Sequence, residues 1–400
     1  MPLPHSIRLL TAGILALPAL LILVVVSPFI AILSIPSLAI LVRRKRHFVT
    51  SFAWYDDLYP LLGHAVITGG SSGIGLAIAL DLARRGCRNI TLIARKEGQL
   101  LDAKRLVEAA SSRCSTTETP AIVRIVSVDV TNFEALDKAI SKLIIGNNDT
   151  NDDSVANAIG AETSTNVSLR PGPPTLLFHC AGYSLPLAFD DLSPSDFRAQ
   201  MDVNYLGSVH IVKAILAYMT KGGNIVLTSS MSGQAGTYGY SAYSPTKFAL
   251  RGFAECLSME LATRRRGLTT MSNYVNVSLA YPPDTKTPGY EIENRSKPEA
   301  CRLISESGGI WDANVVGKGI VEKALCTNPP FDIYFGIDGW MLSTLSAGMS
   351  PVTSDVDVIC QVALMGLLRF VSLFYLMDFG RITQNCRETK ILCQDTCKQD

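Results

Sequence analysis

A short apolar stretch that runs into a glycine-rich turn constrains the fold of this chain most. Residues 65–67 (Ala-Val-Ile) read as a buried strand, and Thr-Gly-Gly-Ser-Ser-Gly-Ile-Gly follows at 68–75. Apolar residues then recur at helical spacing, at Leu76, Ile78, Ala79, Leu82 and Ala83. A strand, a glycine turn and a helix in this order predict an α/β protein with a Rossmann-type, doubly wound parallel sheet. The glycines let the backbone approach a pyrophosphate, which the start of the helix attracts.

Further apolar runs predict the rest of the sheet. They lie at 89–94, 122–128, 175–180, 224–228, 273–279 and 331–336. Arg95 and Lys96 end the first of these runs, where an NAD site would have a carboxylate for the ribose 2′-hydroxyl. A basic residue there suits a 2′-phosphate, so we expect NADPH, and Gln99 lies one helical turn further on. The alternative is that Arg95 is merely a solvated residue at a strand end.

A tyrosine and a lysine stand four residues apart in Tyr-Ser-Ala-Tyr-Ser-Pro-Thr-Lys, at 240–247. On a helix this spacing places Tyr243 and Lys247 on one face. An isolated phenol titrates near pH ~10, and a neighbouring ammonium lowers that pKa. Tyr243 is therefore a candidate proton donor to a substrate oxygen. The alternative is an ordinary amphipathic helix, because such pairs are common.

Three other features accompany this pair. Ser229 and Ser230 directly follow the apolar run at 224–228, and so are expected at the carboxyl end of a strand. Asn204 lies inside a helical pattern that continues through 209–212. Together with the glycine turn, the order Asn, Ser and Tyr-x-x-x-Lys resembles the short-chain dehydrogenase/reductase family. The resemblance extends over about residues 61 to 335.

The resemblance implies catalytic roles. Ser230 hydrogen-bonds the substrate carbonyl, Tyr243 donates the proton, and Lys247 lowers the Tyr243 pKa while holding the nicotinamide ribose. Asn204 connects Lys247 to the proton supply through water. Either Ser229 or Ser230 is the active serine, and the family spacing to Tyr243 favours Ser230.

The same resemblance implies the cofactor contacts. Asp129 approaches the adenine amino group with Val130 beside it, and Pro282 and Thr285 belong to the segment that contacts the nicotinamide. Asp129 is alternatively a cap for the helix that starts near Asn132. The residues expected to bind the cofactor are Gly69, Ser71, Ser72, Gly73, Ile74, Gly75, Arg95, Gln99, Asp129, Val130, Tyr243, Lys247, Pro282 and Thr285.

Several motifs narrow the resemblance. Ser-Val-Asp-Val at 127–130, His-Cys-Ala-Gly at 179–182 and Ala-Tyr-Pro-Pro-Asp-Thr-Lys-Thr-Pro-Gly at 280–289 are similar to a branch of the family that serves sphingolipid synthesis. That branch implies NADPH-dependent reduction of a ketone on a long-chain lipid. The alternatives are a steroid, retinoid or 3-ketoacyl carbonyl as substrate, or a non-catalytic NADP(H)-binding scaffold. His179-Cys180 replaces the Asn-Asn that the family usually has, which puts a backbone-supporting hydrogen bond in question.

The amino-terminal end is apolar. Residues 9–42 carry no charge, and the run is longer than the roughly 20 residues that span a bilayer and too long for the core of a signal peptide. Four basic residues follow at 43–46, and such residues tend to stay cytoplasmic. We expect residues 1–46 to be a membrane anchor. The family and the anchor imply the endoplasmic reticulum membrane, with the catalytic domain facing the cytosol.

The remaining boundaries follow from composition. We expect an NADP-binding reductase domain at 60–338, with a flexible polar insertion at 145–174, and an apolar helix and tail at 339–400. The run at 358–377 contains Gln361 and Arg369, and an arginine at a bilayer centre costs about 2.5 to 3.5 kcal/mol. This cost counts against one clean membrane span, and a helix that lies in the membrane interface or is buried in a homodimer is an equal alternative. The balance of 36 basic and 35 acidic residues suggests no nucleic-acid partner, and the ten cysteines lack metal-site spacing.

Overall fold

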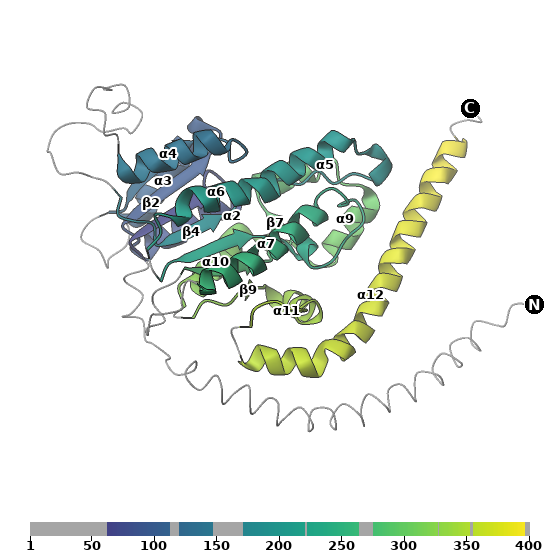
Figure 1. Cartoon of the computed structure of the whole chain (residues 1–400). Helices are drawn as coiled ribbons and strands as arrows, with labels where there is room; N and C mark the ends of the chain where they lie inside the picture. The colour runs from purple at the N-terminus through teal and green to yellow at the C-terminus, as the bar shows by residue number, and fades with distance from the viewer. Residues whose placement is uncertain are drawn as a thin grey trace, which may run out of the picture.

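The computed structural model describes residues 62–112, 120–146, 171–220, 222–263, 275–326, 328–352 and 355–396 (Figure 1). The strands are β1 (His64–Thr68), β2 (Asn89–Ala94), β3 (Ile122–Ser127), β4 (Leu176–His179), β5 (Asn224–Thr228), β6 (Asn276–Ala280), β7 (Thr285–Lys286), β8 (Trp311–Asp312) and β9 (Asp332–Ile333). The α-helices are α2 (Gly73–Arg84), α3 (Glu97–Ser111), α4 (Phe133–Ile145), α5 (Pro194–Met201), α6 (Gly207–Leu216), α7 (Ser244–Thr263), α8 (Pro288–Glu293), α9 (Glu299–Glu306), α10 (Ala313–Ala324), α11 (Gly336–Leu345) and α12 (Asp355–Thr396). A π-helical turn, Asp202–Leu206, joins α5 to α6.

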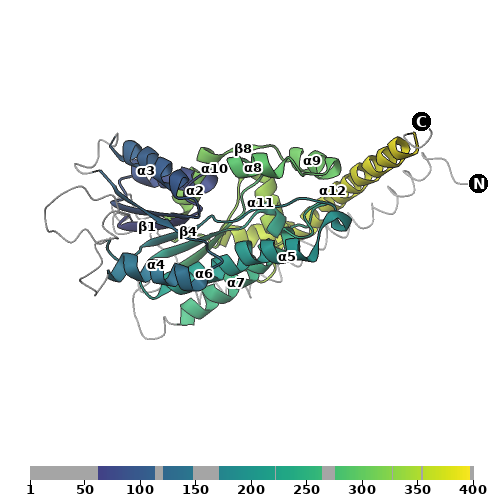
Figure 2. The ribbon, with the colours of Figure 1, turned by 90° about the horizontal axis from the view of Figure 1, so that it is seen from above.

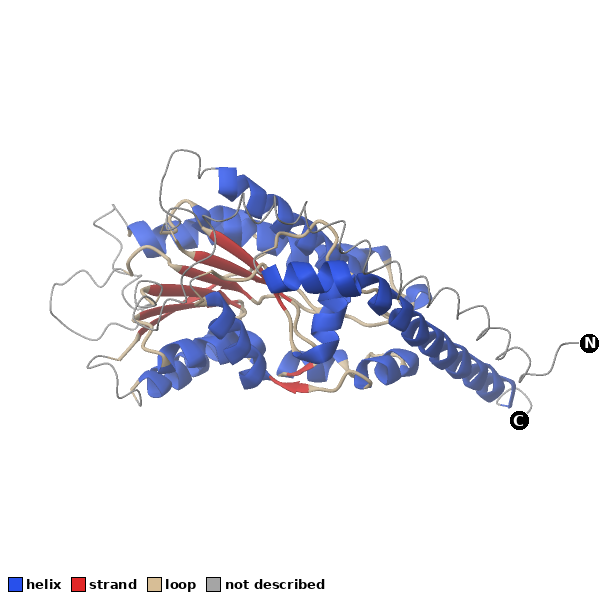
Figure 3. Cartoon of the chain, turned by 90° about the horizontal axis from the view of Figure 1, so that it is seen from below, coloured by secondary structure: helices blue, strands red, loops and turns tan. Residues whose placement is uncertain are grey.

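One parallel sheet organises the domain. Its strand order is β3-β2-β1-β4-β5-β6-β9, and β7 and β8 form a separate parallel pair. The chain leaves β3 at one edge and returns to β4 beside β1, which is the doubly wound topology predicted from the sequence. Figure 3 shows the strands in red between helices. Ligands bind such sheets at the carboxyl ends of the strands, where the winding reverses.

Most predicted strands lie where expected. β2 and β5 begin and end at the predicted residues. β9 spans two residues rather than 331–336, because Gly336 (φ 65°) turns the chain into α11. Of the predicted strand at 273–279, the first two residues lie outside the described residues, and β6 continues to Ala280.

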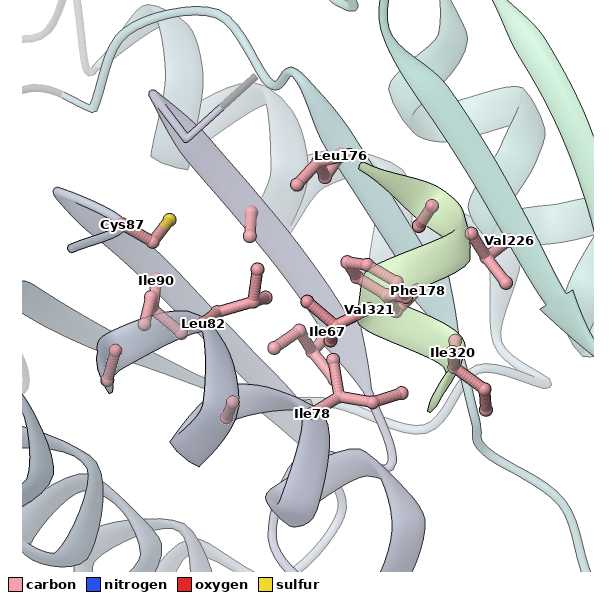
Figure 4. Packing of buried hydrophobic residues seen from close by; sticks show 14 of the residues in the cluster. Ile67, Ile78, Leu82, Cys87, Ile90, Leu176, Phe178, Val226, Ile320 and Val321 are labelled. Carbon is pink, nitrogen blue, oxygen red and sulfur yellow. The ribbon is translucent and has the colours of Figure 1, made fainter. Parts of the chain in front are cut away.

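Apolar side chains alternate between the two faces of the sheet. Ile67 packs with α2, α3 and α10 on one face, whereas Val66 packs with α4, α6 and α7 on the other. Figure 2 shows these two helical layers, and Figure 4 shows Phe178 among side chains from α2 and α10. Fully burying a side chain such as Phe178 contributes about 1.5 to 3 kcal/mol. The packing holds the strand ends, and thus the site, in place.

The carboxyl-terminal part leaves this core. Arg251 on α7 donates hydrogen bonds to the backbone oxygens of Ser346 and Ala347, at 2.7 and 2.9 Å, which ties the end of α11 to the domain. α12 then extends beyond the sheet, in yellow in Figures 1 and 2. Among the described residues, α12 is the helix that is long and apolar enough to cross a membrane, over Val356–Thr389. Only 6% of its most apolar stretch is buried inside the protein. The predicted anchor at 1–46, and the predicted insertion between 147 and 170, lie outside the described residues.

Candidate active site

A cavity of about 480 Å³ opens at the carboxyl ends of the strands. The loops that follow β1 to β6 all contribute side chains to its wall. This is the position where a doubly wound sheet binds its ligand.

The glycine turn forms a close-packed cradle at one end of the cavity. Gly69 has a φ of +65°, a left-handed conformation that glycine adopts without strain. A Cβ on Gly75 would lie 2.4 Å from the Gly69 carbonyl oxygen, so no other residue fits there without a backbone shift. Ser72 precedes α2 and its side chain makes no capping hydrogen bond. The amino terminus of α2 therefore faces the cavity as an anion site of the kind that holds a pyrophosphate.

The residues predicted to bind the cofactor meet around this cavity. The wall includes Gly69, Ser71, Ser72, Gly73, Ile74, Gly75, Arg95, Gln99, Asp129, Val130, Tyr243, Lys247, Pro282 and Thr285. The set fits a dinucleotide, because a glycine cradle lies at one end of it and the Tyr-Lys pair lies in the same wall. Arg95, largely exposed, has its Nη1 3.8 Å from Asp129 Oδ2. Asp129 is not the helix cap, because Asn132 caps α4 by accepting from the Ala135 N–H.

Tyr243 and Lys247 lie where the sequence predicts. Tyr243 immediately precedes α7, and Lys247 is in its first turn, with Nζ 5.6 Å from the Tyr243 ring centroid. Burial lowers the pKa of Lys247 to about 8. The expected lowering of the Tyr243 pKa is not found: burial raises this pKa, and the charge of Glu293 raises it further. A hydrogen bond with Ser230 acts in the opposite direction but does not offset burial.

The two adjacent serines are placed differently. Ser230 lines the cavity together with Tyr243, its side chain acts to lower the Tyr243 pKa, and its Oγ accepts from the Ser232 N–H at 3.2 Å. Ser229 is buried, and its Oγ donates to the Lys247 carbonyl at 3.3 Å. A Cβ on Gly233 would lie 2.4 Å from Ser229 Oγ, so this hydroxyl is also packed against the turn at 231–233. Of the two hydroxyls, that of Ser230 is the one that acts on the Tyr243 side chain, whereas that of Ser229 bonds to the backbone of α7.

Asn204 lies behind the cavity wall, in the π-helical turn. Its Oδ1 accepts from the Tyr183 N–H at 2.9 Å, and its Nδ2 donates to the Tyr183 carbonyl and to Thr246 Oγ1 at 2.9 and 3.1 Å. Thr246 Oγ1 in turn donates to the Tyr243 carbonyl at 2.7 Å. A Cβ on Gly182 would lie 2.9 Å from Asn204 Oδ1 and 3.6 Å from Lys247 Nζ. Asn204 therefore joins the loop after β4 to the start of α7, and glycine at 182 leaves space between Asn204 and Lys247.

The unusual His179-Cys180 pair makes hydrogen bonds of its own. His179 Nδ1 lies 2.7 Å from Thr68 Oγ1, which also accepts from the Ala181 N–H at 3.3 Å. Thr228 donates to Cys180 Sγ at 3.4 Å. Burial lowers the pKa of His179 to about 3, so the imidazole is neutral. The ends of β1, β4 and β5 are thus held together without the usual asparagines.

One polar group of the cavity was not predicted. Glu293, at the end of α8, lines the wall and accepts a hydrogen bond from Tyr240 Oη at 2.5 Å. Lys297, whose side chain is only 1% exposed, pairs with it. Glu293 lies in a polar segment that carries no motif for this role, and the signal that could have revealed it is Tyr240, which stands in the same motif as Tyr243.

These features are typical of an oxidoreductase that binds a nicotinamide dinucleotide, with a phenol, a hydroxyl and an ammonium in one wall of the cavity. A family model described as short chain dehydrogenase matches residues 149–297, and one described as KR domain matches residues 63–151. The 3-dehydrosphinganine reductase of Danio rerio is 38% identical over 84% of this chain and 90% of its own length. The 3-ketodihydrosphingosine reductase of Bos taurus is 40% identical over 82% of this chain and 87% of its own length. The chain belongs to the short-chain dehydrogenase/reductase family.

Other matches are more distant. The 3-dehydrosphinganine reductase of Arabidopsis thaliana is 31% identical over 82% of this chain and 87% of its own. A solved short chain dehydrogenase/reductase from Burkholderia phymatum, in complex with NAD, is 23% identical at a TM-score of 0.49, with 68% of this chain and 87% of that chain covered. The solved structure of a polyketide ketoreductase with NADPH is 20% identical at a TM-score of 0.49, with 66% of this chain and 90% of that chain covered.

Proposed function

We propose that this protein reduces the C3 ketone of 3-ketodihydrosphingosine to give dihydrosphingosine, with NADPH as the reductant, in the de novo synthesis of sphingolipids. The observation that carries the proposal is the arrangement of Ser230, Tyr243 and Lys247 on one wall of the cavity, with Asn204 behind them. It is supported by relatives named 3-dehydrosphinganine reductase and 3-ketodihydrosphingosine reductase. The chain covers 87% to 90% of the length of these relatives.

Each side chain has a role that its position allows. The Ser230 hydroxyl hydrogen-bonds the ketone oxygen and then the alkoxide, in a site where the donor is already oriented. Tyr243 gives its proton to that oxygen, and its raised pKa keeps it protonated at neutral pH. Lys247 holds the ribose hydroxyls and keeps a positive charge beside the phenol. Asn204 positions Tyr243 through Thr246. NADPH, when bound, supplies the hydride for the carbonyl carbon.

We further propose that the cofactor is NADPH rather than NADH. Arg95, at the end of β2, and Gln99, on α3, line the end of the cavity nearest the second strand. A guanidinium recognises the 2′-phosphate by charge and by paired hydrogen bonds. Arg95 remains largely exposed beside Asp129, so it is accessible to a phosphate.

The chain is proposed to act at the endoplasmic reticulum membrane, with the domain at 60–338 in the cytosol and residues 1–46 as the anchor. The helix α12 supports a membrane location, because it leaves large apolar side chains exposed along its length. They include Val356, Ile359, Val362, Leu367, Phe370 and Phe374. A lipid substrate with a long chain is concentrated in the membrane, and an anchored enzyme meets it there.

The function is tested by NADPH oxidation in detergent micelles with 3-ketodihydrosphingosine, beside a steroid ketone, a retinal and an NADH control. We expect turnover of the sphingoid ketone with NADPH. Tyr243→Phe should lower it by about a hundredfold to ten-thousandfold while NADPH still binds. The matched control is Tyr238→Phe on the exposed part of the same loop, which should keep full activity. Binding of NADPH by the wild type without turnover of any of the three substrates would overturn the proposal.

A further inference from the structure

A carboxylate network lies next to the proton donor, and the reduction step itself does not use it. Glu293 Oε1 accepts from Tyr240 Oη at 2.5 Å and lies 3.2 Å from Lys297 Nζ. The same ammonium lies 3.3 Å from Asp284 Oδ2. Glu293, Asp284 and Tyr240 all line the cavity. The network is thus part of the wall that a substrate contacts.

The charges of this network do not balance. Two carboxylates share one ammonium, so Asp284, Glu293 and Lys297 together carry one negative charge when both carboxyl groups are ionised. The Lys297 side chain is 1% exposed and is also 3.3 Å from Ser305 Oγ and 4.7 Å from the Tyr290 ring centroid, so it has no room to move toward a ligand. The hydrogen bond from Tyr240 and the ion pair with Lys297 both fall on Glu293 Oε1, and no hydrogen bond joins Oε2 to a described residue. A partly buried excess charge is costly unless a cation pairs with it.

The uncompensated carboxylate is close to the reaction centre. The rings of Tyr240 and Tyr243 lie 5.6 Å apart between centroids, and Tyr240 donates to Glu293. The negative charge of Glu293 acts on Tyr243. After burial, it contributes most to the raised pKa of that phenol. A cation bound at Glu293 would therefore lie in the same cavity as a ketone oxygen held by Tyr243.

We propose that Glu293 binds the primary ammonium group that the substrate carries on the carbon next to its ketone. The proposal rests on the proposed function and specifies which feature of the lipid is recognised. An ammonium beside the ketone completes the charge balance of the network through Glu293 Oε2. A neutral lipid ketone leaves this carboxylate without a partner, and a site built to pair with a group rejects analogues that lack it.

The bound ammonium also affects the proton donor. A positive charge between Glu293 and Tyr243 opposes the carboxylate field that disfavours loss of the phenolic proton. The amine-bearing substrate thus promotes proton transfer to its own ketone oxygen. A steroid or retinoid carbonyl brings no such charge.

The test compares 3-ketodihydrosphingosine with 1-hydroxyoctadecan-3-one, which lacks the amine, as substrates of the full-length enzyme in micelles with NADPH. We expect the wild type to favour the amine by about tenfold to a hundredfold in kcat/KM, the worth of one hydrogen bond to a charged group. The Glu293→Gln enzyme should lose most of that preference, because its kcat/KM falls for the amine-bearing ketone and not for the other. Glu291→Gln, the same change on the same helix but exposed, should keep it.

The outcomes separate the two proposals. Equal use of both ketones by the wild type overturns the ammonium site, whatever the variants do. An equal loss on both ketones in Glu293→Gln, with NADPH affinity unchanged, also overturns it, because Glu293 would then support the fold of the wall and not the amine. If the wild type binds NADPH and reduces neither ketone, the proposed function fails first and the ammonium site fails with it.

Discussion

Lys247 Nζ donates a hydrogen bond to the backbone oxygen of Thr228 at 2.9 Å. This bond joins the first turn of α7 to the end of β5, two residues before Ser230. It fixes the ammonium in a buried position, where desolvation disfavours the charged form and lowers its pKa to about 8. The charge beside Tyr243 is therefore close to its titration point at physiological pH.

A pH dependence follows from this pKa. As pH rises through about 8, Lys247 of the free enzyme loses its proton, whereas the raised pKa of Tyr243 keeps the phenol protonated. We expect kcat/KM for NADPH, which reports on the free enzyme, to fall above about pH 8. The residual activity of Lys247→Met should show no such decline. A wild-type profile that stays flat to pH ~10 would contradict the assignment.

The adjacent serines make a matched pair. Ser230→Ala removes a hydroxyl that lines the cavity with Tyr243 and should lower kcat by about a hundredfold, as loss of a preformed oxyanion donor does. Ser229→Ala removes only a hydrogen bond to the Lys247 carbonyl and should change kcat by less than about tenfold, since it affects packing. Single-turnover reduction of the ketone measures both. The reverse order of effects would reassign the active serine.

Cofactor preference should depend on Arg95. Arg95→Ala removes the guanidinium at the end of β2, and we expect the NADPH over NADH preference in kcat/KM to fall by about tenfold to a hundredfold. NADH use should change little. Arg105→Ala, on the exposed face of α3 and outside the cavity, is the control. An unchanged ratio in Arg95→Ala would mean that Arg95 is merely a solvated residue.

The sheet was the most predictable part of the molecule. β2 and β5 are inner strands covered on both faces, so each reads as a largely apolar run, Asn-Ile-Thr-Leu-Ile-Ala and Asn-Ile-Val-Leu-Thr, and both were predicted to the residue. The pair β7 and β8 was not predicted. Each spans two residues, which is too short to give a periodic pattern in the sequence. The two strands form because they pair with each other, with Thr285 opposite Trp311, 26 positions further along the chain.

The site was predictable where its parts are local. Tyr243 and Lys247 are four residues apart, and their neighbourhood follows from helix geometry alone. Glu293 and Tyr240 are 53 residues apart, and nothing in a single sequence brings them together. The sign of the Tyr243 pKa shift was missed for a related reason. The neighbouring cation is visible in the motif, but the depth of burial, which dominates, is not.

Attachment of the carboxyl-terminal segment depends on one half-buried side chain. Arg251 Nη2 donates to the carbonyls of Ser346 and Ala347, which follow α11, and to Ser350 Oγ, at 2.7 to 2.9 Å. Its Nε pairs with Glu255 Oε1 at 2.9 Å. Arg251→Met keeps the length of the apolar stem but leaves the two carbonyls and the carboxylate without this donor. We expect the free energy of unfolding to fall by about 2 to 4 kcal/mol.

The measurement is the thermal midpoint of the NADPH-bound enzyme, together with limited proteolysis of the connection between α11 and α12. Arg251→Met should melt several degrees lower and be cleaved faster there, because that connection loses its hydrogen bonds to α7. Arg302→Met removes an arginine that also bridges two carboxylates, Glu299 and Glu306, but on the exposed face of α9, and it should leave the midpoint unchanged. Equal midpoints and equal cleavage in the two variants would show that α12 is held by its apolar contacts with α9 and α11 and not by Arg251.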